Sequence, residues 1–395
     1  MKKAIRQMGI KELNEMFDLA AYAFNSEKTE KRKEHFKQIV EHSQNYGCFS
    51  ENVLMSQVIS TPFTVDFHGT VHKMAGIGCV SSYPEYRGQG SISAIMSKLL
   101  EDLAEQEASL AYLAPFSYPF YRKYGFEQLF EQISYTIKAA DWPHVKVGSG
   151  KMKRVNFEEI KPICQTIYAG LEKNQRGGMI RENWWLDYSL GSDEKNSFAI
   201  YEDEEGNVTG YLIYRSSAAR FTIKEWGYLS NQAFQALVGF IGSHNGSSQE
   251  FYFETGHTGH DLSHLMPAPL VDMKLTPFMM GRIVSIEAFL HRYPFAPGKK
   301  ETYYFEVVDF YAPWNEGTWR LSINEAGQGT VEKCSEKIDS SRVINGTIQA
   351  WTQLFMGYCT SSELLFYERI HGESKLLEEL GDRLVKGKPV LEEYF

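Results

Sequence analysis

The order of apolar and polar residues predicts alternating helices and strands at the start of the chain. Over residues 10–24 apolar side chains recur every three or four positions, which is the spacing of an amphipathic helix. Residues 63–67 and 71–81 have strand-like patterns and are separated by His68-Gly69, so they predict a hairpin. The second of these segments is apolar enough to form a buried strand.

A glycine-rich turn follows this hairpin and leads into a second helix. Apolar positions over residues 92–103 again have helical spacing, and the apolar segment 110–116 predicts another strand. A short helix then ends near Gly125, a residue suited to the left-handed conformation that closes many helices. Residues 1–140 therefore predict a compact α/β domain.

The middle of the chain repeats this order in a weaker form. Residues 139–154 change to Pro, Gly and Lys, which is typical of a linker. Beyond them, residues 157–174 predict a helix, residues 198–215 predict two strands around a turn, and residues 232–244 predict a further helix. No glycine-rich turn accompanies this second set, so we expect a degenerate second copy of the first domain.

The last part of the chain has a pattern of its own. Strand-like segments at 303–311 and 317–323 precede helix-like segments at 342–358 and 376–385. A chain of 395 residues is long enough for several domains. We expect three domains, over residues 1–140, 141–285 and 286–395.

Cysteine content and charge exclude several classes of protein. The five cysteines are scattered without Cys-x-x-Cys spacing, which argues against a disulfide framework or a structural zinc site. The formal net charge of −9 disfavours nucleic acid as a partner and favours cationic small molecules or peptides. No segment resembles a signal peptide or reaches the roughly 18 to 20 apolar residues of a membrane span, so we expect a cytoplasmic protein.

The turn Arg87-Gly88-Gln89-Gly90 is the strongest candidate for a ligand site. A glycine-rich turn at the start of a helix directs backbone N–H groups outward, and the helix dipole adds partial positive charge there. An anion suits such a turn, and Arg87 can add a charged contact to a phosphate. The spacing of a phosphate-binding P-loop is absent, and Ser93 replaces the third glycine of a dinucleotide fingerprint.

The motifs around this turn resemble those of the GCN5-related N-acetyltransferases (GNAT). The pattern Val-x-x-x-Pro-x-x-Arg-Gly-x-Gly starts at Val80, and Phe-Tyr-x-x-x-Gly-Phe follows at Phe120. The turn resembles the pyrophosphate loop of that family, although Ile92 stands where the family has Gly or Ala. Segments 279–290 and 309–323 and the aromatic C-terminus extend the resemblance to the enhanced intracellular survival (Eis) acetyltransferases.

The resemblance implies an α/β fold: tandem acetyltransferase-like domains followed by a sterol-carrier-like domain. It also implies acetyl-CoA as the acetyl donor and substrate, with no metal. Tyr121 matches the family's proton donor, and the α-carboxylate of Phe395 matches its general base. The residues that match positions binding the coenzyme are Val80, Ser81, Ser82, Arg87, Gly88, Gln89, Gly90, Ser91, Ile92, Ser93, Phe116 and Ser117.

The chemistry of amine acetylation suits these two groups unequally. A phenol with a pKa near 10 is a reasonable donor to a departing thiolate. An α-carboxyl group, with a reference pKa of about 3.3 to 3.7, is too acidic to deprotonate an ammonium group directly. It would act through water, or with a pKa raised by burial among aromatic side chains.

Other polar and aromatic clusters have simpler interpretations. His257, His260 and His264 share one face if helical, but the glycine in this segment favours a surface loop over a metal site. Trp184 and Trp185 either line an acceptor pocket or pack in a core. The acidic run at 202–205 is typical of a solvated hairpin tip.

We therefore expect an acetyltransferase that acts directly, through a ternary complex, on a primary amine of an aminoglycoside, polyamine or lysine. The alternative is a binding protein with an inactive acetyltransferase fold and an apolar ligand in its last domain. A third possibility, an aminoacyl transferase, would need a basic face that the composition disfavours. The resemblance implies a homo-oligomer, a hexamer in the family, and no membrane partner.

Overall fold

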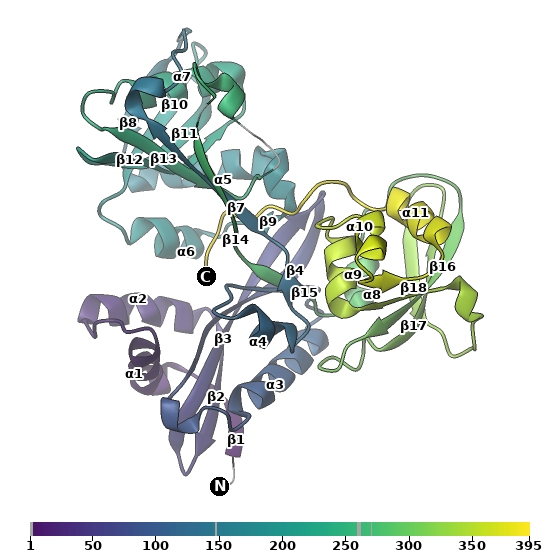
Figure 1. Cartoon of the computed structure of the whole chain (residues 1–395). Helices are drawn as coiled ribbons and strands as arrows, with labels where there is room; N and C mark the ends of the chain where they lie inside the picture. The colour runs from purple at the N-terminus through teal and green to yellow at the C-terminus, as the bar shows by residue number, and fades with distance from the viewer. Residues whose placement is uncertain (1–2, 147, 259–261, 270) are drawn as a thin grey trace. The chain divides into compact units, whose positions relative to one another are not determined.

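The computed structural model describes residues 3–146, 148–258, 262–269 and 271–395 (Figure 1). The chain forms two compact units. The first combines Met1–Phe130, Phe278–Pro389 and Glu393–Phe395, and the second combines Glu131–Pro277 and Val390–Glu392.

One sheet of the first unit carries the segments that the N-terminal pattern predicts. Its strand order is β1-β2-β3-β4-β5-β15-β6. Neighbouring strands are antiparallel except β4 and β5, which are parallel and joined by a helix. The strands are β1 (Lys3–Met8), β2 (Gln44–Ser50), β3 (Val53–Phe67), β4 (Thr70–Ser82), β5 (Leu110–Leu113), β15 (Met280–Ile283) and β6 (Glu127–Gln128). The predicted hairpin at His68-Gly69 is confirmed as the β3–β4 turn.

Helices lie on both faces of this sheet. They are α1 (Leu13–Ala23), α2 (Glu30–Glu41), α3 (Ser91–Glu105) and α4 (Tyr118–Arg122), with short 3-10 turns at η1 (Ile10–Glu12) and η2 (Pro84–Tyr86). The Gln57 side chain bonds the Met16 carbonyl of α1 at 3.0 Å, while the next residue, Val58, packs in the core cluster that contains α3 and α4. Because successive side chains of a strand point to opposite faces, α1 covers one face, and α3 and α4 the other.

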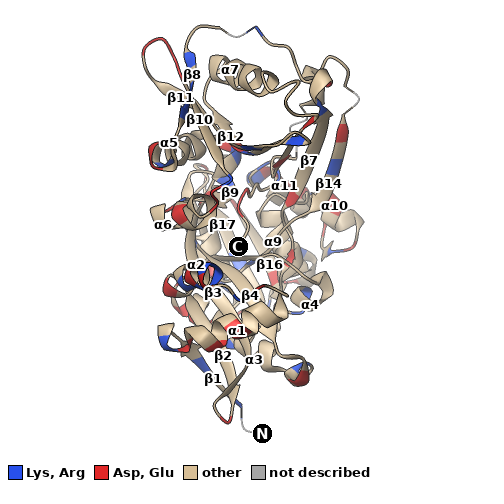
Figure 2. Ribbon diagram, turned by 90° about the vertical axis from the view of Figure 1, so that its left-hand side faces the viewer, with Lys and Arg blue, Asp and Glu red and all other residues tan. Residues whose placement is uncertain are grey.

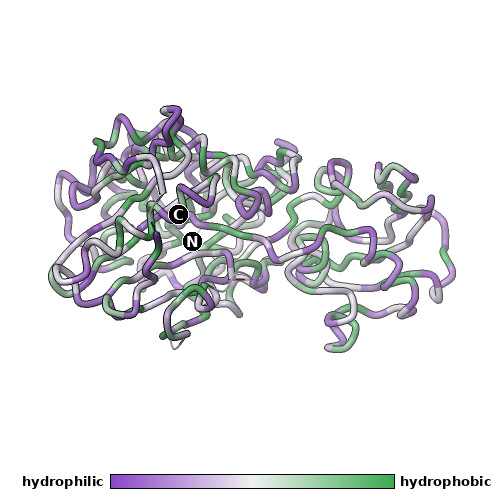
Figure 3. The backbone as a smooth tube through the Cα atoms, turned by 90° about the horizontal axis from the view of Figure 1, so that it is seen from above, coloured by the Kyte–Doolittle hydropathy of each residue, from purple (hydrophilic) through white to green (hydrophobic). Residues whose placement is uncertain are grey.

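The first unit also contains a smaller sheet of order β18-β17-β16-β19-β20. Its strands are β16 (Glu301–Val308), β17 (Gly317–Ile323), β18 (Gly329–Lys333), β19 (Val343–Thr347) and β20 (Ile370–His371). Its helices are α8 (Ile286–Leu290), α9 (Ile348–Phe355), α10 (Ser361–Phe366) and α11 (Ser374–Arg383), with η7 (Ser340–Arg342). Buried Tyr303, Phe305 and Val307 alternate with more exposed residues along β16, and Figure 3 shows the hydropathy of the backbone.

The second unit contains a sheet of order β14-β7-β13-β12-β11-β10-β8. Its strands are β7 (Glu131–Lys138), β8 (Lys151–Val155), β10 (Ser197–Glu202), β11 (Val208–Ser216), β12 (Arg220–Tyr228), β13 (Glu250–Thr255) and β14 (Asp272–Pro277), and a short β9 spans Arg176–Met179. Its helical segments are η3 (Ala139–Asp141), α5 (Phe157–Gly170), η4 (Glu172–Gln175), α6 (Asn183–Leu186), η5 (Asp187–Gly191), α7 (Asn231–Gly242) and η6 (Ser263–Leu265). The order β12, α7, β13, with β13 parallel to β12, repeats that of β4, α3, β5.

The predicted linker at 139–154 is wrong at both of its ends, although the described residues between 143 and 150 form no helix or strand. Residues 151–155 form β8, which pairs with β10, and Trp142 is buried, with its indole nitrogen bonded to the Val238 carbonyl at 2.9 Å. The sheet of this unit also includes β7, which precedes the predicted boundary at residue 141. Pro and Gly content indicates where a chain turns, but it does not exclude a short strand between two turns.

Charged side chains are mixed along the helices, as Figure 2 shows for α2, where Lys37 lies 3.2 Å from Glu34. Such exposed pairs contribute little stability. In the described part of the chain, every helix is too short or too polar to cross a membrane.

Candidate active site

The glycine-rich turn forms an open cradle at the start of α3. Gly88 and Gly90 have φ angles of 73° and 78°, and a methyl group built on either would meet no atom within 4 Å. Gly90 is the N-cap of α3 and offers no side-chain cap, and the first helical N–H to find a carbonyl is that of Ala94, which bonds Gly90. The N–H groups before Ala94 are therefore available to an anion.

A buried hydroxyl supports this interpretation of the turn. The Ser91 side chain is 3% exposed, and its Oγ has no hydrogen-bond partner among the described residues. A buried hydroxyl without a partner costs free energy, and an oxygen-rich ligand in the cradle would remove that cost. The turn thus fits a pyrophosphate.

Two lysines from other elements contact residues of this turn, and a third lines a pocket beside Arg87; the sequence motifs did not point to any of them. Lys3 bonds the carbonyl of Gln89, and Lys123 donates to Ser93 Oγ at 2.9 Å. A pocket of about 460 Å³ between the end of α1 and η2 is lined by Lys28 and Arg87. Contacts in the fold, and not spacing in the sequence, therefore bring Lys3 and Lys123 to the turn, and Lys28 to a pocket that Arg87 also lines.

Strand β4 separates from β5 beside the cradle. Their pairing ends at Ile77 and Leu113, whereas β4 continues to Ser82. A bulge lies opposite Val58, where Cys79 has a φ of 52°, so the strand changes direction just before Val80. The backbone edge of Val80, Ser81 and Ser82 that faces away from β3 has no β5 partner and can pair with an extended ligand.

Tyr121 belongs to the core cluster that contains Ile77 and against which Val80 packs, and it is 2% exposed. Its ring contacts those of Phe116 and Phe120, with centroids 5.2 and 5.1 Å away. Burial raises the pKa of the Tyr121 hydroxyl, and the nearby hydroxyls of Tyr124 and Tyr394 raise it further. The phenol is therefore held in its neutral, proton-donating form.

Tyr124, the neighbouring tyrosine, is already engaged. Its hydroxyl lies 2.9 Å from Ser93 Oγ in the first turn of α3, and its ring contacts Tyr311 with centroids 4.8 Å apart. In the part of the chain that the structure describes, the hydroxyl of Tyr121 makes no such hydrogen bond. Of the two tyrosines, Tyr121 is the one whose hydroxyl can serve a ligand.

Phe395 returns to the centre of β4. Its ring packs against Phe63, with centroids 5.4 Å apart, and fills the space above Gly76, where a methyl group would come within 2.8 Å of the ring. A methyl group at Gly78 would lie 3.5 Å from the Phe395 carboxyl carbon. The terminal carboxylate is thus fixed one residue before the bulge at Cys79.

The remaining predicted residues lie at the edges of this arrangement. Phe116 is 69% exposed, and the Ser117 carbonyl accepts the Tyr121 N–H at 3.3 Å, so both belong to the turn that precedes α4. Ile92 packs against the core cluster under α3. Trp185 is 1% exposed in the second unit, and Trp184 bonds Glu182 at 3.0 Å.

The equivalent helix of the second unit lacks a cradle. Ser230 caps α7 by accepting the Ala233 N–H at 3.1 Å, so its helix start is satisfied from within. The described residues contain no cluster of three potential metal ligands, and His260 of the histidine segment lies outside them.

Comparison with known proteins decides the family. Models of the acetyltransferase (GNAT) domain match residues 4–129 and 177–283, and a sterol carrier protein domain model matches residues 286–392. A crystal structure from Enterococcus faecalis, described as a conserved protein of unknown function and probable N-acyltransferase, is 51% identical. It covers 100% of both chains, with a TM-score of 0.97. The chain belongs to the GCN5-related N-acetyltransferases.

More distant relatives of this acetyltransferase are consistent with the same family and fold. An uncharacterized N-acetyltransferase of Streptomyces coelicolor is 22% identical over 77% of this chain and 78% of its own length. Eis1 of Mycobacterium abscessus is 19% identical, covers 99% of this chain and 100% of its own, and has a TM-score of 0.80, which shows a shared fold. The expected tandem GNAT domains with a following sterol-carrier-like domain are confirmed.

Proposed function

We propose that this acetyltransferase moves the acetyl group of acetyl-CoA to a primary amine of a cationic acceptor, by direct attack in a ternary complex. The observation that carries this proposal is the convergence of three features at the open end of β4. These are the α3 cradle, the buried phenol of Tyr121 and the carboxylate of Phe395 at Gly78. The coenzyme supplies an activated thioester, and the chain orients it and moves the protons.

The backbone positions the donor first. The N–H groups from Gly88 to Ser93 hold the pyrophosphate, with added charge from Arg87 and Lys123. The pantetheine arm pairs along the free edge of β4 at Val80 to Ser82, which directs the thioester toward the bulge. Most of the rate acceleration then comes from this positioning.

Two groups of the chain handle the protons. The acceptor nitrogen forms a bond to the acetyl carbon while the carbon–sulfur bond breaks, so the nitrogen must lose a proton and the sulfur must gain one. The Phe395 carboxylate accepts the proton from the amine, directly or through water, and the Tyr121 hydroxyl donates one to the thiolate. No redox partner is needed for this balance.

The high pKa of Cys79, which follows Gly78 in β4, also favours direct transfer over a route through an acetylated cysteine. Burial raises the pKa of the Cys79 thiol to about 12, and its sulfur accepts a 3.3 Å hydrogen bond from Gln57. A thiol with so high a pKa has a very small thiolate fraction at neutral pH, so it is a poor nucleophile for an acetyl-enzyme route.

Thiol release tests the proposal. The protein is incubated with acetyl-CoA and a panel of aminoglycosides, polyamines and lysine peptides, and the mass of each acceptor is measured. We expect a gain of one acetyl group on a cationic acceptor, together with an equal amount of free thiol. No thiol release across the panel would favour a binding protein with an inactive acetyltransferase fold.

A further inference from the structure

The turn that carries Tyr121 is held by side chains that are distant in the sequence, one from β15 of the same sheet and one from α9 of the sterol-carrier-like domain. Within the turn, the Tyr121 carbonyl accepts the N–H groups of Tyr124 at 2.9 Å and Phe126 at 3.3 Å. Two other carbonyls of the turn are bonded by distant side chains. The Arg282 Nη1 donates to the Tyr124 carbonyl at 2.6 Å, and the Gln349 Nε2 of α9 donates to the Arg122 carbonyl at 2.9 Å.

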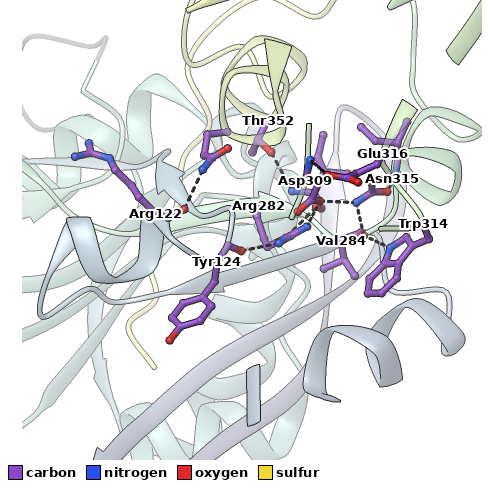
Figure 4. A network of polar contacts seen from close by, with 12 residues as sticks. Arg122, Tyr124, Arg282, Val284, Asp309, Trp314, Asn315, Glu316 and Thr352 are labelled. Atoms are coloured by element: carbon purple, nitrogen blue, oxygen red, sulfur yellow. Dashed lines mark hydrogen bonds and ion pairs between the residues drawn. The ribbon is translucent and has the colours of Figure 1, made fainter. Parts of the chain in front are cut away.

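Arg282 is itself fixed by the sterol-carrier-like domain. Its side chain is fully buried, and its Nη2 lies 2.6 Å from Asp309 Oδ2 (Figure 4). Asn315 donates to the same carboxylate oxygen at 2.9 Å and to the Val284 carbonyl at 3.0 Å. Both ends of the guanidinium group are therefore engaged, one by the tyrosine turn and the other by Asp309.

Gly125 makes room for this arrangement. It has a φ of 83°, and a methyl group at this position would lie 2.6 Å from Arg282 Nη1. Two physical requirements thus explain why glycine occupies this position of the Tyr-x-x-x-Gly-Phe motif. It adopts a left-handed conformation, and it lets the guanidinium group reach the Tyr124 carbonyl.

We propose that Arg282 is a positioning residue for Tyr121, linking the placement of the phenol to Asp309 of the last domain. This inference rests on the proposed function, in which Tyr121 donates a proton to the departing thiolate. A planar, rigid guanidinium group can bond a carbonyl and a carboxylate at once with fixed geometry. A lysine ammonium would keep the charge beside Asp309 but could not reproduce both contacts.

The alternative is that Arg282 has a purely structural role, and a substitution at Arg383 is the matched control that tests this alternative. Arg383 is a buried arginine of the sterol-carrier-like domain, and it donates to the carbonyls of Ala296 at 2.8 Å and Asn324 at 2.9 Å. It makes no contact with the tyrosine turn in the described part of the chain. Arg383→Lys therefore disturbs a comparable buried guanidinium group without touching Tyr121.

A double-mutant cycle on the full chain tests the proposal. Arg282→Lys, Tyr121→Phe, their combination and Arg383→Lys are compared at a temperature where melting curves show all of them folded. We expect Arg282→Lys to lower kcat about tenfold while KM for acetyl-CoA changes less than twofold, since a misplaced catalytic group affects turnover more than donor binding. Tyr121→Phe should mask this loss, so the combination should be no slower than Tyr121→Phe alone.

Two results would overturn the proposal. The losses from Arg282→Lys and Tyr121→Phe would multiply if the arginine acted elsewhere, and Arg383→Lys would lower kcat equally if the effect were general. Should Arg282→Lys fail to fold, Gln349→Ala removes one contact to the same turn and enters the cycle in its place. If Tyr121→Phe alone leaves kcat unchanged, the proposed donor is wrong, a result that differs from missing coupling.

Discussion

At the candidate site, side chains of the same type differ in their hydrogen bonds and packing, and these differences determine what each can contribute. Tyr121 and Tyr124 lie three residues apart and are both buried, yet only Tyr124 bonds Ser93. In the proposed mechanism Phe395 contributes its α-carboxylate, and its ring packs on Phe63 and Gly76 of β3 and β4. At this scale, the hydrogen bonds and packing around a group determine which chemistry it can perform.

Removal of the Tyr121 hydroxyl should slow acetyl transfer without weakening coenzyme binding. We expect Tyr121→Phe to lower kcat about 100-fold, within the range for a general acid, with KM for acetyl-CoA nearly unchanged. Burial raises the pKa of this phenol, and the protonated form is the donor, so wild-type kcat should not fall with rising pH until beyond about pH 10. A descending limb below pH 9 that disappears in Tyr121→Phe would contradict this assignment.

Displacement of the Phe395 ring should impair catalysis selectively. In Gly76→Ala the new methyl group would come within 2.8 Å of both the Phe395 ring and the Phe63 ring, so the packed pair, including the terminal residue, must shift. We expect kcat to fall about tenfold while calorimetry shows unchanged coenzyme A affinity. Gly9→Ala is the control, because a methyl group there meets nothing within 4 Å. Equal kcat values for both variants would remove the tail from the mechanism.

Elements determine where the donor lies. Helix α3 begins with an uncapped glycine and an unpaired serine hydroxyl, whereas α7 begins with Ser230 as its own cap. The helices share their place after a central strand, but only α3 can accept an anion. The same crossover thus has an open helix start in one copy of the domain and a capped helix start in the other.

The contribution of a lysine outside α3 to phosphate binding should be measurable as a change in coenzyme A affinity. Lys123 lies against the first turn of α3 through Ser93, so Lys123→Gln should weaken coenzyme A binding about threefold to tenfold and reduce its salt dependence. Lys98→Gln is the control on the same helix, since Lys98 pairs with Asp102 at 2.6 Å, away from the cradle. Equal affinities for Lys123→Gln and the wild type would exclude this lysine from the phosphate site.

At the scale of the whole molecule, our proposals connect the last domain to the catalytic site in two ways. Its final residue carries the carboxylate, and its Asp309 holds Arg282 against the tyrosine turn. Arg369 adds a further link, because it lies 3.2 Å from buried Glu127, which also pairs with Arg122. In the proposed mechanism, a domain of sterol-carrier type therefore contributes to a transferase site.

Extension of the chain beyond Phe395 tests this relation at the scale of the whole protein. A short C-terminal tag converts the terminal carboxylate into an amide and must pass the packed ring. We expect turnover to fall about 100-fold while coenzyme A affinity stays within twofold of the untagged protein. The same tag at the N-terminus serves as the control. Full turnover with a C-terminal tag would contradict a catalytic role for this carboxylate.

Local sequence patterns were sufficient for much of the first domain. Helical spacing over 92–103 and the glycines of the turn predicted α3 and its open start, because both depend on interactions within a few residues. The motif around Tyr121 likewise predicted α4 and the left-handed Gly125. Short strands such as β8 and β15 were missed, since their identity depends on partners that are distant in the sequence.

By itself the sequence predicted the open turn before α3, because backbone conformation and amphipathic spacing are local properties, and its motifs, through their resemblance to a family, indicated the candidate donor and the order of the domains. Only the tertiary structure decided that Phe395 lies on Gly76 and Gly78, that Lys123 reaches Ser93, and that Arg282 bridges Tyr124 and Asp309. Each of these contacts joins residues that are at least 27 positions apart. Such contacts form only when the packing of whole elements places them together, and no local pattern records that packing.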